Sequence, residues 1–301
     1  MTELRRTQLA VPASDEKMMA NAAESDADEV FLDLEDSVAP NAKAEAREPL
    51  VQAANEHDWS DKLLSYRING VDTRWWYDDV IEVIAEAGEY IDDIIVPKVP
   101  NASELQTVDD LVTQVEVNND LEVGGIGLEP QIEDGEGMHN VHEIAHSTDR
   151  LSCLIFGPGD YAAAMGTPGL DIGQFPDYPG HYWHHALSEC NAAAKSAGVP
   201  CTDGPYADID DAEGFRTSAE RANMLGCDGK WAIHPSQIEI ANEVFAPDPE
   251  VAERAKRIVD AYAEAMAEGK GAVSVDGQMV DEATNKMAQD IVEKAEAAGI
   301  L

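Results

Sequence analysis

Residues 29–57, EVFLDLEDSVAPNAKAEAREPLVQAANEH, contain the pattern that decides the fold. A short apolar run, Glu29–Leu34, is followed by a polar turn and then by a helical stretch, Asn41–His57. This order is typical of a parallel βα unit, because the helix returns the chain to the edge of the sheet where the next strand starts.

The same unit recurs along most of the chain. We expect strands at Gln8–Pro12, Glu29–Leu34, Leu63–Asn69, Asp93–Val99, Gly125–Ile132, Leu151–Gly157, Pro200–Asp203 and Lys230–His234. The helical stretches between them include Asn41–His57, Tyr77–Ala87, Ser103–Asn118, Met138–Ser147, His181–Ala197 and Ala212–Leu225. Alternating units of this number predict an α/β fold, a closed (β/α)8 TIM barrel. An open doubly wound sheet is the main alternative, although no GxGxxG follows the first strand.

The chain continues beyond the last of these units. Pro247-Asp-Pro249 marks a break. Two more helical stretches follow, at about Glu250–Glu268 and Asp281–Ala298, on either side of Gly269–Gly277. We therefore expect a catalytic barrel over residues 1–246 and a C-terminal helical extension over residues 247–301, which is either a packing appendage or a lid.

The charge of the chain narrows its partners. Asp and Glu number 60 against 20 Lys and Arg, for a formal net charge of −40. Such a surface repels nucleic acid and anionic membranes, so we expect neither as a partner. The acids are interleaved with apolar segments, which favours a folded chain over a disordered one. A cytoplasm rich in salt would screen their mutual repulsion, so the composition suggests a halophilic protein.

The sequence shows no targeting signal and no metal-binding cysteine motif. Residues 1–6 are not followed by an apolar h-region, and no apolar run reaches membrane-spanning length. The four cysteines lack paired spacing, so we expect them to be reduced and structural in a cytoplasmic protein.

Candidate reactive groups follow the predicted strands, since a barrel of this type carries its chemistry at the C-terminal strand ends. These ends hold Asp33, Glu35, Asp36, Arg67, Asn69, Lys98, Glu129, Glu133, Asp160, Asp203 and His234. Many carboxylates around one arginine suit a hard cation such as Mg²⁺, which prefers oxygen ligands and leaves positions for substrate. The same acids could instead form salt-bridged loops or solvated turns, and Glu129 competes with Glu133 as a ligand.

Three other chemistries compete with a Mg²⁺ enzyme. Two groups of histidines lie at helical spacing, His139, His142 and His146, and His181, His184 and His185. Neither group lies at a predicted strand end and no HExxH is present, which disfavours zinc. Lys98 could form a Schiff base in a metal-free aldolase, but the adjacent carboxylates favour a metal. Cys153 or Cys201 as a nucleophile lacks a convincing partner histidine.

Several motifs together resemble one known superfamily. They are Asp33–Pro40 (DLEDSVAP) with Lys43 and Ala46-Arg47, Val96–Lys98 (VPK), Phe156–Asp160 (FGPGD), Asp203–Tyr206 (DGPY) and Gly229–Pro235 (GKWAIHP). In this order they resemble the citrate lyase β-subunit/HpcH-HpaI aldolase superfamily. Within it, Arg67–Thr73 (RINGVDT), Trp76-Tyr77 and Ala241–Phe245 (ANEVF) look most like L-malyl-CoA/β-methylmalyl-CoA lyases.

The resemblance implies a lyase with a TIM barrel, bound Mg²⁺ or Mn²⁺, a CoA thioester substrate, and a homotrimer or hexamer. Glu133 and Asp160 would be the metal ligands, and Arg67 would contact the glyoxylate-derived oxygen. The backbone of Gly157, Pro158 and Gly159 would line the small-acid pocket. Glu35 and Asp36 would hold metal-bound waters or orient Arg67. The C-terminal segment would close over a neighbouring subunit's site and supply the acid/base Asp281.

One departure concerns the CoA phosphates. Members of the superfamily often carry basic residues just after the first strand, where this chain has Asp15 and Asn21. Lys17 is the nearby substitute. The expected reaction is reversible cleavage of a malyl-CoA to glyoxylate and acetyl-CoA or propionyl-CoA. Citramalyl-CoA cleavage, malyl-CoA hydrolysis and a non-autonomous citrate lyase β-like subunit are the alternatives.

The charge excess generates a first prediction. Removing salt lengthens the Debye length from about 3 Å at 1 M to about 30 Å at 0.01 M, so repulsion among the acids then acts over much of the surface. The melting temperature should fall as KCl is lowered from molar to millimolar concentration. Thermal unfolding followed by circular dichroism checks this, and an unchanged melting temperature would refute it.

Overall fold

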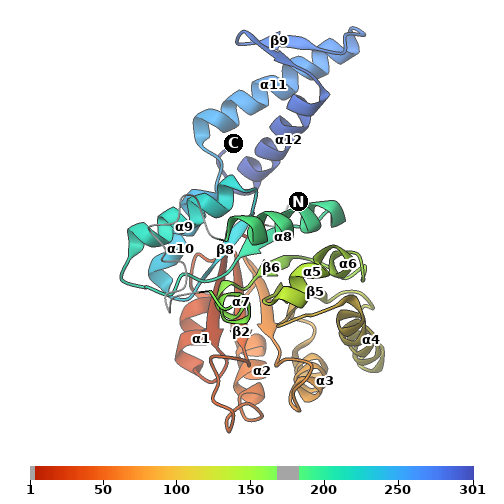
Figure 1. Cartoon of the computed structure of the whole chain (residues 1–301), viewed down its shortest axis with the longest axis vertical. Helices are drawn as coiled ribbons and strands as arrows, with labels where there is room; N and C mark the ends of the chain where they lie inside the picture. The colour runs from red at the N-terminus through yellow and green to blue at the C-terminus, as the bar shows by residue number, and fades with distance from the viewer. Residues whose placement is uncertain (1–3, 168–182) are drawn as a thin grey trace. The chain divides into compact units, whose positions relative to one another are not determined.

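A closed parallel barrel forms the larger part of the chain (Figure 1). The computed structural model describes residues 4–167 and 183–301. The strands are β1 (Thr7–Pro12), β2 (Glu29–Asp33), β3 (Leu63–Arg67), β4 (Asp93–Val96), β5 (Gly127–Ile132), β6 (Leu154–Phe156), β7 (Cys201–Asp203) and β8 (Gly229–Ala232). They are hydrogen-bonded in sequence order, and β8 pairs with β1. The barrel prediction is therefore confirmed and the open sheet is excluded.

Helices connect and surround the strands (Figure 1). They are α1 (Glu16–Ala23), α2 (Arg47–Glu56), α3 (Trp76–Ala87), α4 (Ala102–Asn118), α5 (Gly135–His139), α6 (Val141–Ala145), α7 (Pro158–Met165), α8 (His184–Ala197), α9 (Ala212–Met224), the 3₁₀ turn η1 (Pro235–Gln237) and α10 (Ile238–Phe245). The predicted helix 138–147 is two short helices, and the expected start at His181 lies outside the described residues. Within the described parts of the chain, no helix combines the length and apolar composition needed to cross a bilayer.

Three helices were not predicted from the sequence. The first, α1, is too short and polar to give a clear period, and α10 directly follows η1. The third, α7, overlaps the Phe156–Asp160 motif after the sixth strand, where no helix was expected. It begins with Pro158 at its first turn, a position where the missing backbone N–H of proline has no intrahelical partner to lose.

The C-terminal residues form a compact unit of their own, and each unit is described by itself. The barrel unit is Arg5–Asn242, and the second unit contains Glu243–Leu301. In it, α11 (Pro249–Ala267) and α12 (Glu282–Ala297) pack on each other, and β9 (Val273–Val275) and β10 (Gln278–Val280) form an antiparallel hairpin. Asp276 and Gly277 both have positive φ, as the tight turn between two such strands requires. No strand was expected from the sequence in this segment.

The barrel interior is built in layers that follow the two-residue period of the strands. Along β2, Glu29, Phe31 and Asp33 point to the same face, and on β3 Ser65 and Arg67 do so. The middle layer is apolar and contains Phe31, Ile95, Cys153, Ile155 and Trp231. It separates a polar cluster near the N-terminal strand ends from the charged groups at the C-terminal ends.

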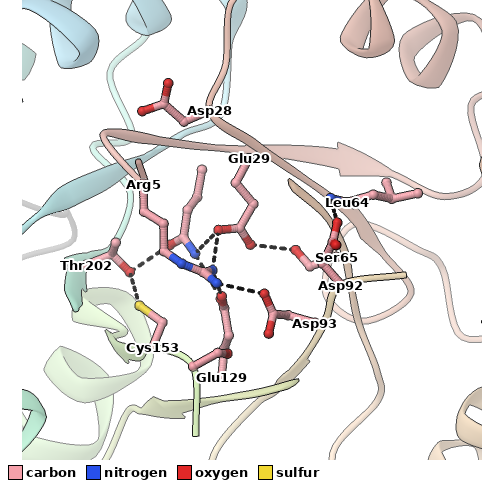
Figure 2. A network of polar contacts seen from close by, with 12 residues as sticks. Arg5, Asp28, Glu29, Leu64, Ser65, Asp92, Asp93, Glu129, Cys153 and Thr202 are labelled. Atoms are coloured by element: carbon pink, nitrogen blue, oxygen red, sulfur yellow. Dashed lines mark hydrogen bonds and ion pairs between the residues drawn. The ribbon is translucent and has the colours of Figure 1, made fainter. Parts of the chain in front are cut away.

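The polar cluster near the N-terminal strand ends is centred on Arg5, which precedes β1 (Figure 2). Its Nη1 donates to Glu29 at 2.8 Å and to Glu129, and its Nη2 donates to Asp93 at 2.8 Å. All four side chains are buried. Burial raises the pKa of Glu29 and raises that of Glu129 further, because one guanidinium faces three carboxyl groups. The folded barrel therefore takes up protons that the unfolded chain releases.

Replacing Arg5 should destabilise the barrel in a pH-dependent way. Arg5→Met leaves the buried acids without a counter-charge, which costs about 3–5 kcal/mol of unfolding free energy. The Arg5 charge opposes the rise of the pKa of Glu29 and Glu129, so removing it should raise these folded-state values further. The loss should therefore grow as pH rises above about 4.3, the ordinary glutamate value.

Urea denaturation at pH 5 and pH 8 in constant KCl measures this difference. Arg6→Met is the matched control, since Arg6 pairs with Asp28 nearer the surface. A loss for Arg5→Met that equals the control, or that is the same at both pH values, would contradict the prediction.

Candidate functional site

The turn after β2 is shaped by the carboxylate that ends the strand. Asp33 Oδ1 accepts the backbone N–H of Glu35 at 2.8 Å, and its Oδ2 accepts that of Ser37 at 3.0 Å. Aspartate commonly organises turns in this way. The turn buries Glu35 and leaves Asp36 exposed.

The same carboxylate fixes Arg67, its neighbour across β2 and β3. Arg67 donates from Nε and Nη2 to the two Asp33 oxygens, each at 2.8 Å. Burial raises the carboxyl pKa by itself, but the Arg67 charge and the hydrogen bonds outweigh it and lower the pKa of Asp33 to about 2. The lowered pKa favours the charged form of this ion pair at neutral pH.

Three further contacts hold the Arg67 guanidinium in place. It lies over the rings of Phe31 and Trp231, at 5.9 and 5.3 Å from their centroids. Its Nη1 lies 3.1 Å from Glu35 Oε2, an ion pair without a hydrogen bond. A guanidinium fixed on one side by a carboxylate and below by aromatic rings offers a preorganised positive group to the space above the barrel.

Lys43 and Asn69 support the turn from behind. Lys43 Nζ donates to the carbonyl oxygens of Leu34 and Glu35, at 3.1 and 2.6 Å, and to Asn69 Oδ1 at 2.6 Å. Asn69 in turn donates to the buried carboxylate of Asp79. Lys43 drew attention only as part of a motif, and its structural role needed the fold.

Glu133 follows β5 and is buried at the base of a cavity. Its Oε2 atom has no hydrogen-bond partner, and burial raises its pKa well above the usual glutamate value despite the nearby Arg67. Gly157 makes room for this side chain, since a Cβ there would lie 2.5 Å from Glu133 Cγ. A buried carboxylate oxygen without a partner is a group that a cation would satisfy.

Asp160 lies in the first turn of α7, with its side chain 48% exposed. Its Oδ2 lies 3.2 Å from Lys98 Nζ, which also contacts Glu35 Oε1 at 2.5 Å and Asp36 Oδ1 at 3.7 Å. A cavity of about 740 Å³ brings the predicted groups together. Its lining includes Asp33, Asp36, Arg67, Glu133, Gly157, Gly159 and Asp160.

These residues fit a divalent ion with open coordination positions. Within residues 4–167 and 183–301, no group of three or more histidine, cysteine or acidic side chains is arranged to hold a metal. Glu133 and Asp160 line the same cavity, and the former has an unpartnered buried oxygen. Mg²⁺ is commonly held by one or two carboxylates, with the other positions taken by water or substrate. The donor set suits it.

Gln131 is a candidate that the sequence did not indicate. It is buried, lines the cavity, and its Oε1 has no hydrogen-bond partner. It lies on β5, two residues before Glu133, and two-residue spacing along a strand places side chains on one face. Its two-residue spacing from Glu133 was the available signal in the sequence, but a single glutamine in a strand does not by itself predict a site.

Other candidates lie elsewhere in the fold. Glu129 contacts Arg5 and is not among the residues that line the cavity. Glu133 is therefore the candidate metal ligand of the two. Asp203 accepts from Lys230, and His234 caps η1. Among the histidines considered for zinc, His142 contacts Glu189 and His146 contacts Ser196. His181 lies outside the described residues.

Four of the predicted site residues are not among the cavity-lining residues. Glu35 is buried in the turn after β2, against Lys98 and Arg67. Pro158 is buried at the start of α7. Lys17 is exposed on α1. Asp281 belongs to the C-terminal unit, where it caps α12 and accepts from the backbone and hydroxyl of Thr284. These hydrogen bonds lower the pKa of Asp281.

Comparison with known proteins shows which family the chain belongs to. Residues 6–235 match the family model HpcH/HpaI aldolase/citrate lyase. The L-malyl-CoA/beta-methylmalyl-CoA lyase of Rhodobacter capsulatus is 42% identical over 307 residues, covering 99% of this chain and 96% of that protein. The malyl-CoA/beta-methylmalyl-CoA/citramalyl-CoA lyase of Chloroflexus aurantiacus is 32% identical over 279 residues, covering 87% and 79%.

A solved structure extends the likeness to three dimensions. The protein CitE from Mycobacterium tuberculosis, in complex with magnesium, acetoacetate and coenzyme A, superposes with a TM-score of 0.74 at 27% identity. The match covers 96% of this chain and 97% of that one. Both the predicted superfamily and the prediction of an enzyme are confirmed. The chain is a lyase-type enzyme and belongs to the HpcH/HpaI aldolase/citrate lyase family.

Proposed function

We propose that this enzyme reversibly cleaves L-malyl-CoA and β-methylmalyl-CoA to glyoxylate and acetyl-CoA or propionyl-CoA. Glu133 and Asp160 hold Mg²⁺, or Mn²⁺, for this reaction. The observation that carries the proposal is the single cavity lined by Arg67, Glu133 and Asp160. The Rhodobacter capsulatus relative, with 42% identity over nearly the whole chain, is named for these two substrates.

The protein's own groups account for orientation and charge. The Arg67 guanidinium, held by Asp33, would donate to the substrate oxygen that becomes the aldehyde oxygen of glyoxylate, where negative charge develops. Glu35 and Asp36 would position Arg67 and hold water beside the metal. The backbone of Gly157, Pro158 and Gly159 would bound the pocket for the small acid. When bound, the divalent ion would polarise the substrate's carboxylate and hydroxyl oxygens.

The proton balance needs one base and one acid. In cleavage, the water held by Glu35 and Asp36 would accept the proton of the hydroxyl, the carbon–carbon bond would break, and the electron pair would pass to the thioester as an enolate. Asp281 would donate a proton to that enolate, and in condensation it would act as the base. Its lowered pKa favours the carboxylate, which is the form that the condensing direction requires. We propose that residues 247–301 act as a lid and bring Asp281 to a neighbouring subunit's site in a homotrimer or hexamer.

Citramalyl-CoA is the second candidate substrate, because the Chloroflexus aurantiacus relative is named for it as well. The two reactions differ in the small product, glyoxylate or pyruvate. Incubating the purified chain with Mg²⁺, each oxo acid and either acetyl-CoA or propionyl-CoA, then measuring product masses, tests both. Free thiol without oxo acid would indicate hydrolysis, and no turnover of free CoA thioesters would indicate a non-autonomous subunit.

Neutralising the metal ligands should strongly reduce metal-dependent turnover. Glu133→Gln and Asp160→Asn each remove one charge from the cation site, and we expect Mg²⁺ affinity to fall by about 10- to 100-fold and kcat by about 10³-fold. Calorimetric titration with Mg²⁺ and a glyoxylate assay measure the two effects. Glu136→Gln, an exposed acid on α5, is the control. Full turnover by Asp160→Ala in EDTA would overturn the metal assignment.

Arg67→Lys should keep a positive charge but lose the paired hydrogen bonds to Asp33. Lysine cannot donate two parallel hydrogen bonds to Asp33, so the cation is no longer preorganised for the developing oxyanion. We expect kcat/KM to fall by about 10²- to 10³-fold while Mg²⁺ affinity changes little. Steady-state kinetics together with calorimetry give the two values, and unchanged kinetics would exclude Arg67 from the reaction.

A further inference from the structure

Lys98 is a charged residue in the cavity region that the proposed reaction does not use. Its ammonium contacts three carboxylates, those of Glu35 at 2.5 Å, Asp160 at 3.2 Å and Asp36 at 3.7 Å. These acids come from the turn after β2 and from the start of α7. One flexible side chain therefore joins two loops that carry proposed site residues.

The backbone at Lys98 is unusual. Its φ is 54°, in the left-handed region that L-residues with a side chain rarely adopt. A glycine would meet this requirement with less strain. Residues held in such conformations often serve a site, because the surrounding structure must keep them there. Here the conformation directs the side chain from the end of β4 toward Glu35 and Asp160.

The surroundings of Lys98 are strongly acidic. A second hollow of about 440 Å³ adjoins the main cavity, since Glu133, Asp160 and Ala163 line both. Its lining also contains Asp72, Glu104 and Asp134, and Lys98 is the one basic residue among the described residues that line it. Without a cation, the carboxylates of this region would repel one another, and Lys98 reduces that repulsion.

We propose that Lys98 is a built-in counter-cation of the metal site and sets its affinity for the divalent ion. Its ammonium pairs with the Asp160 carboxylate in the metal-free enzyme, and this ion pair must break when the divalent ion binds. Lys98 is suited to this exchange because its side chain is 41% exposed and can move into water. Arg67 is not, since it is buried and fixed by two hydrogen bonds to Asp33.

The proposal rests on the proposed function, because it assumes that Asp160 is a metal ligand. It adds that Lys98 and the divalent ion compete for the Asp160 carboxylate. Removing the ammonium should leave the metal-free carboxylates without compensation and remove a positive charge beside the ion. Both effects favour the metal-bound state, so Mg²⁺ should bind more tightly when Lys98 is neutralised.

The test compares Mg²⁺ binding by calorimetry and thermal unfolding with and without Mg²⁺, at one KCl concentration. Lys98→Met should bind Mg²⁺ roughly three- to tenfold more tightly than the natural chain. Its metal-free melting temperature should be lower and its rise on adding Mg²⁺ larger. Lys98→Arg should restore the natural values. Lys98→Gln serves as a second neutral variant if Lys98→Met folds poorly.

Lys195→Met is the matched control. Lys195 is 45% exposed and pairs with Asp228 at 2.6 Å, but it lies on α8 outside both cavities. Its replacement should leave Mg²⁺ affinity unchanged. Equal or weaker Mg²⁺ binding by the neutral Lys98 variants would overturn the counter-cation role while leaving the metal site standing. If the natural chain binds no Mg²⁺, the metal assignment fails and this inference fails with it.

Discussion

The C-terminal end of the barrel depends on one interaction, the pair of hydrogen bonds from the Arg67 guanidinium to the Asp33 carboxylate. The two residues face each other in register across β2 and β3, so barrel closure itself brings the charges together. Asp33 uses its oxygens twice, for the guanidinium and for the backbone N–H groups of Glu35 and Ser37. One buried carboxylate thus fixes both the cation and the turn beside it. Its lowered pKa keeps that arrangement charged.

The rest of the interior separates two polar layers by an apolar one. Phe31 and Trp231, whose ring centroids are 4.5 Å apart, lie beneath Arg67 and belong to the apolar cluster that Cys153 and Ile155 complete. The Arg5 cluster at the other end satisfies its carboxyl groups internally (Figure 2). Glu133 keeps an unpartnered oxygen toward the cavity. The barrel therefore uses buried acids in two ways, as closed networks for stability and as open ligands for chemistry.

The cations around the site differ in how firmly they are held. Lys43 is buried, and its ammonium donates to three protein oxygens, so it serves the turn alone. Arg67 is fixed but faces the cavity, which suits stabilisation of a developing oxyanion. Lys98 is half exposed and contacts carboxylates that a divalent ion would also attract. This gradation gives an acid-rich enzyme both a rigid electrophilic group and an exchangeable charge.

The sequence alone determined the eight-strand pattern, the barrel, and the strand ends at which Arg67, Glu133 and Asp160 lie, because hydrophobic periodicity and strand–helix alternation are local properties. It also gave the family, through the order of its motifs. Local pattern did not predict α7, which starts within the glycine-containing motif Phe156–Asp160. Only the tertiary structure decided which acids remain open, because the partner of a buried charge comes from far along the chain. Arg5 and Glu129 are 124 residues apart, and Glu133, which directly follows the same strand, lines the cavity instead.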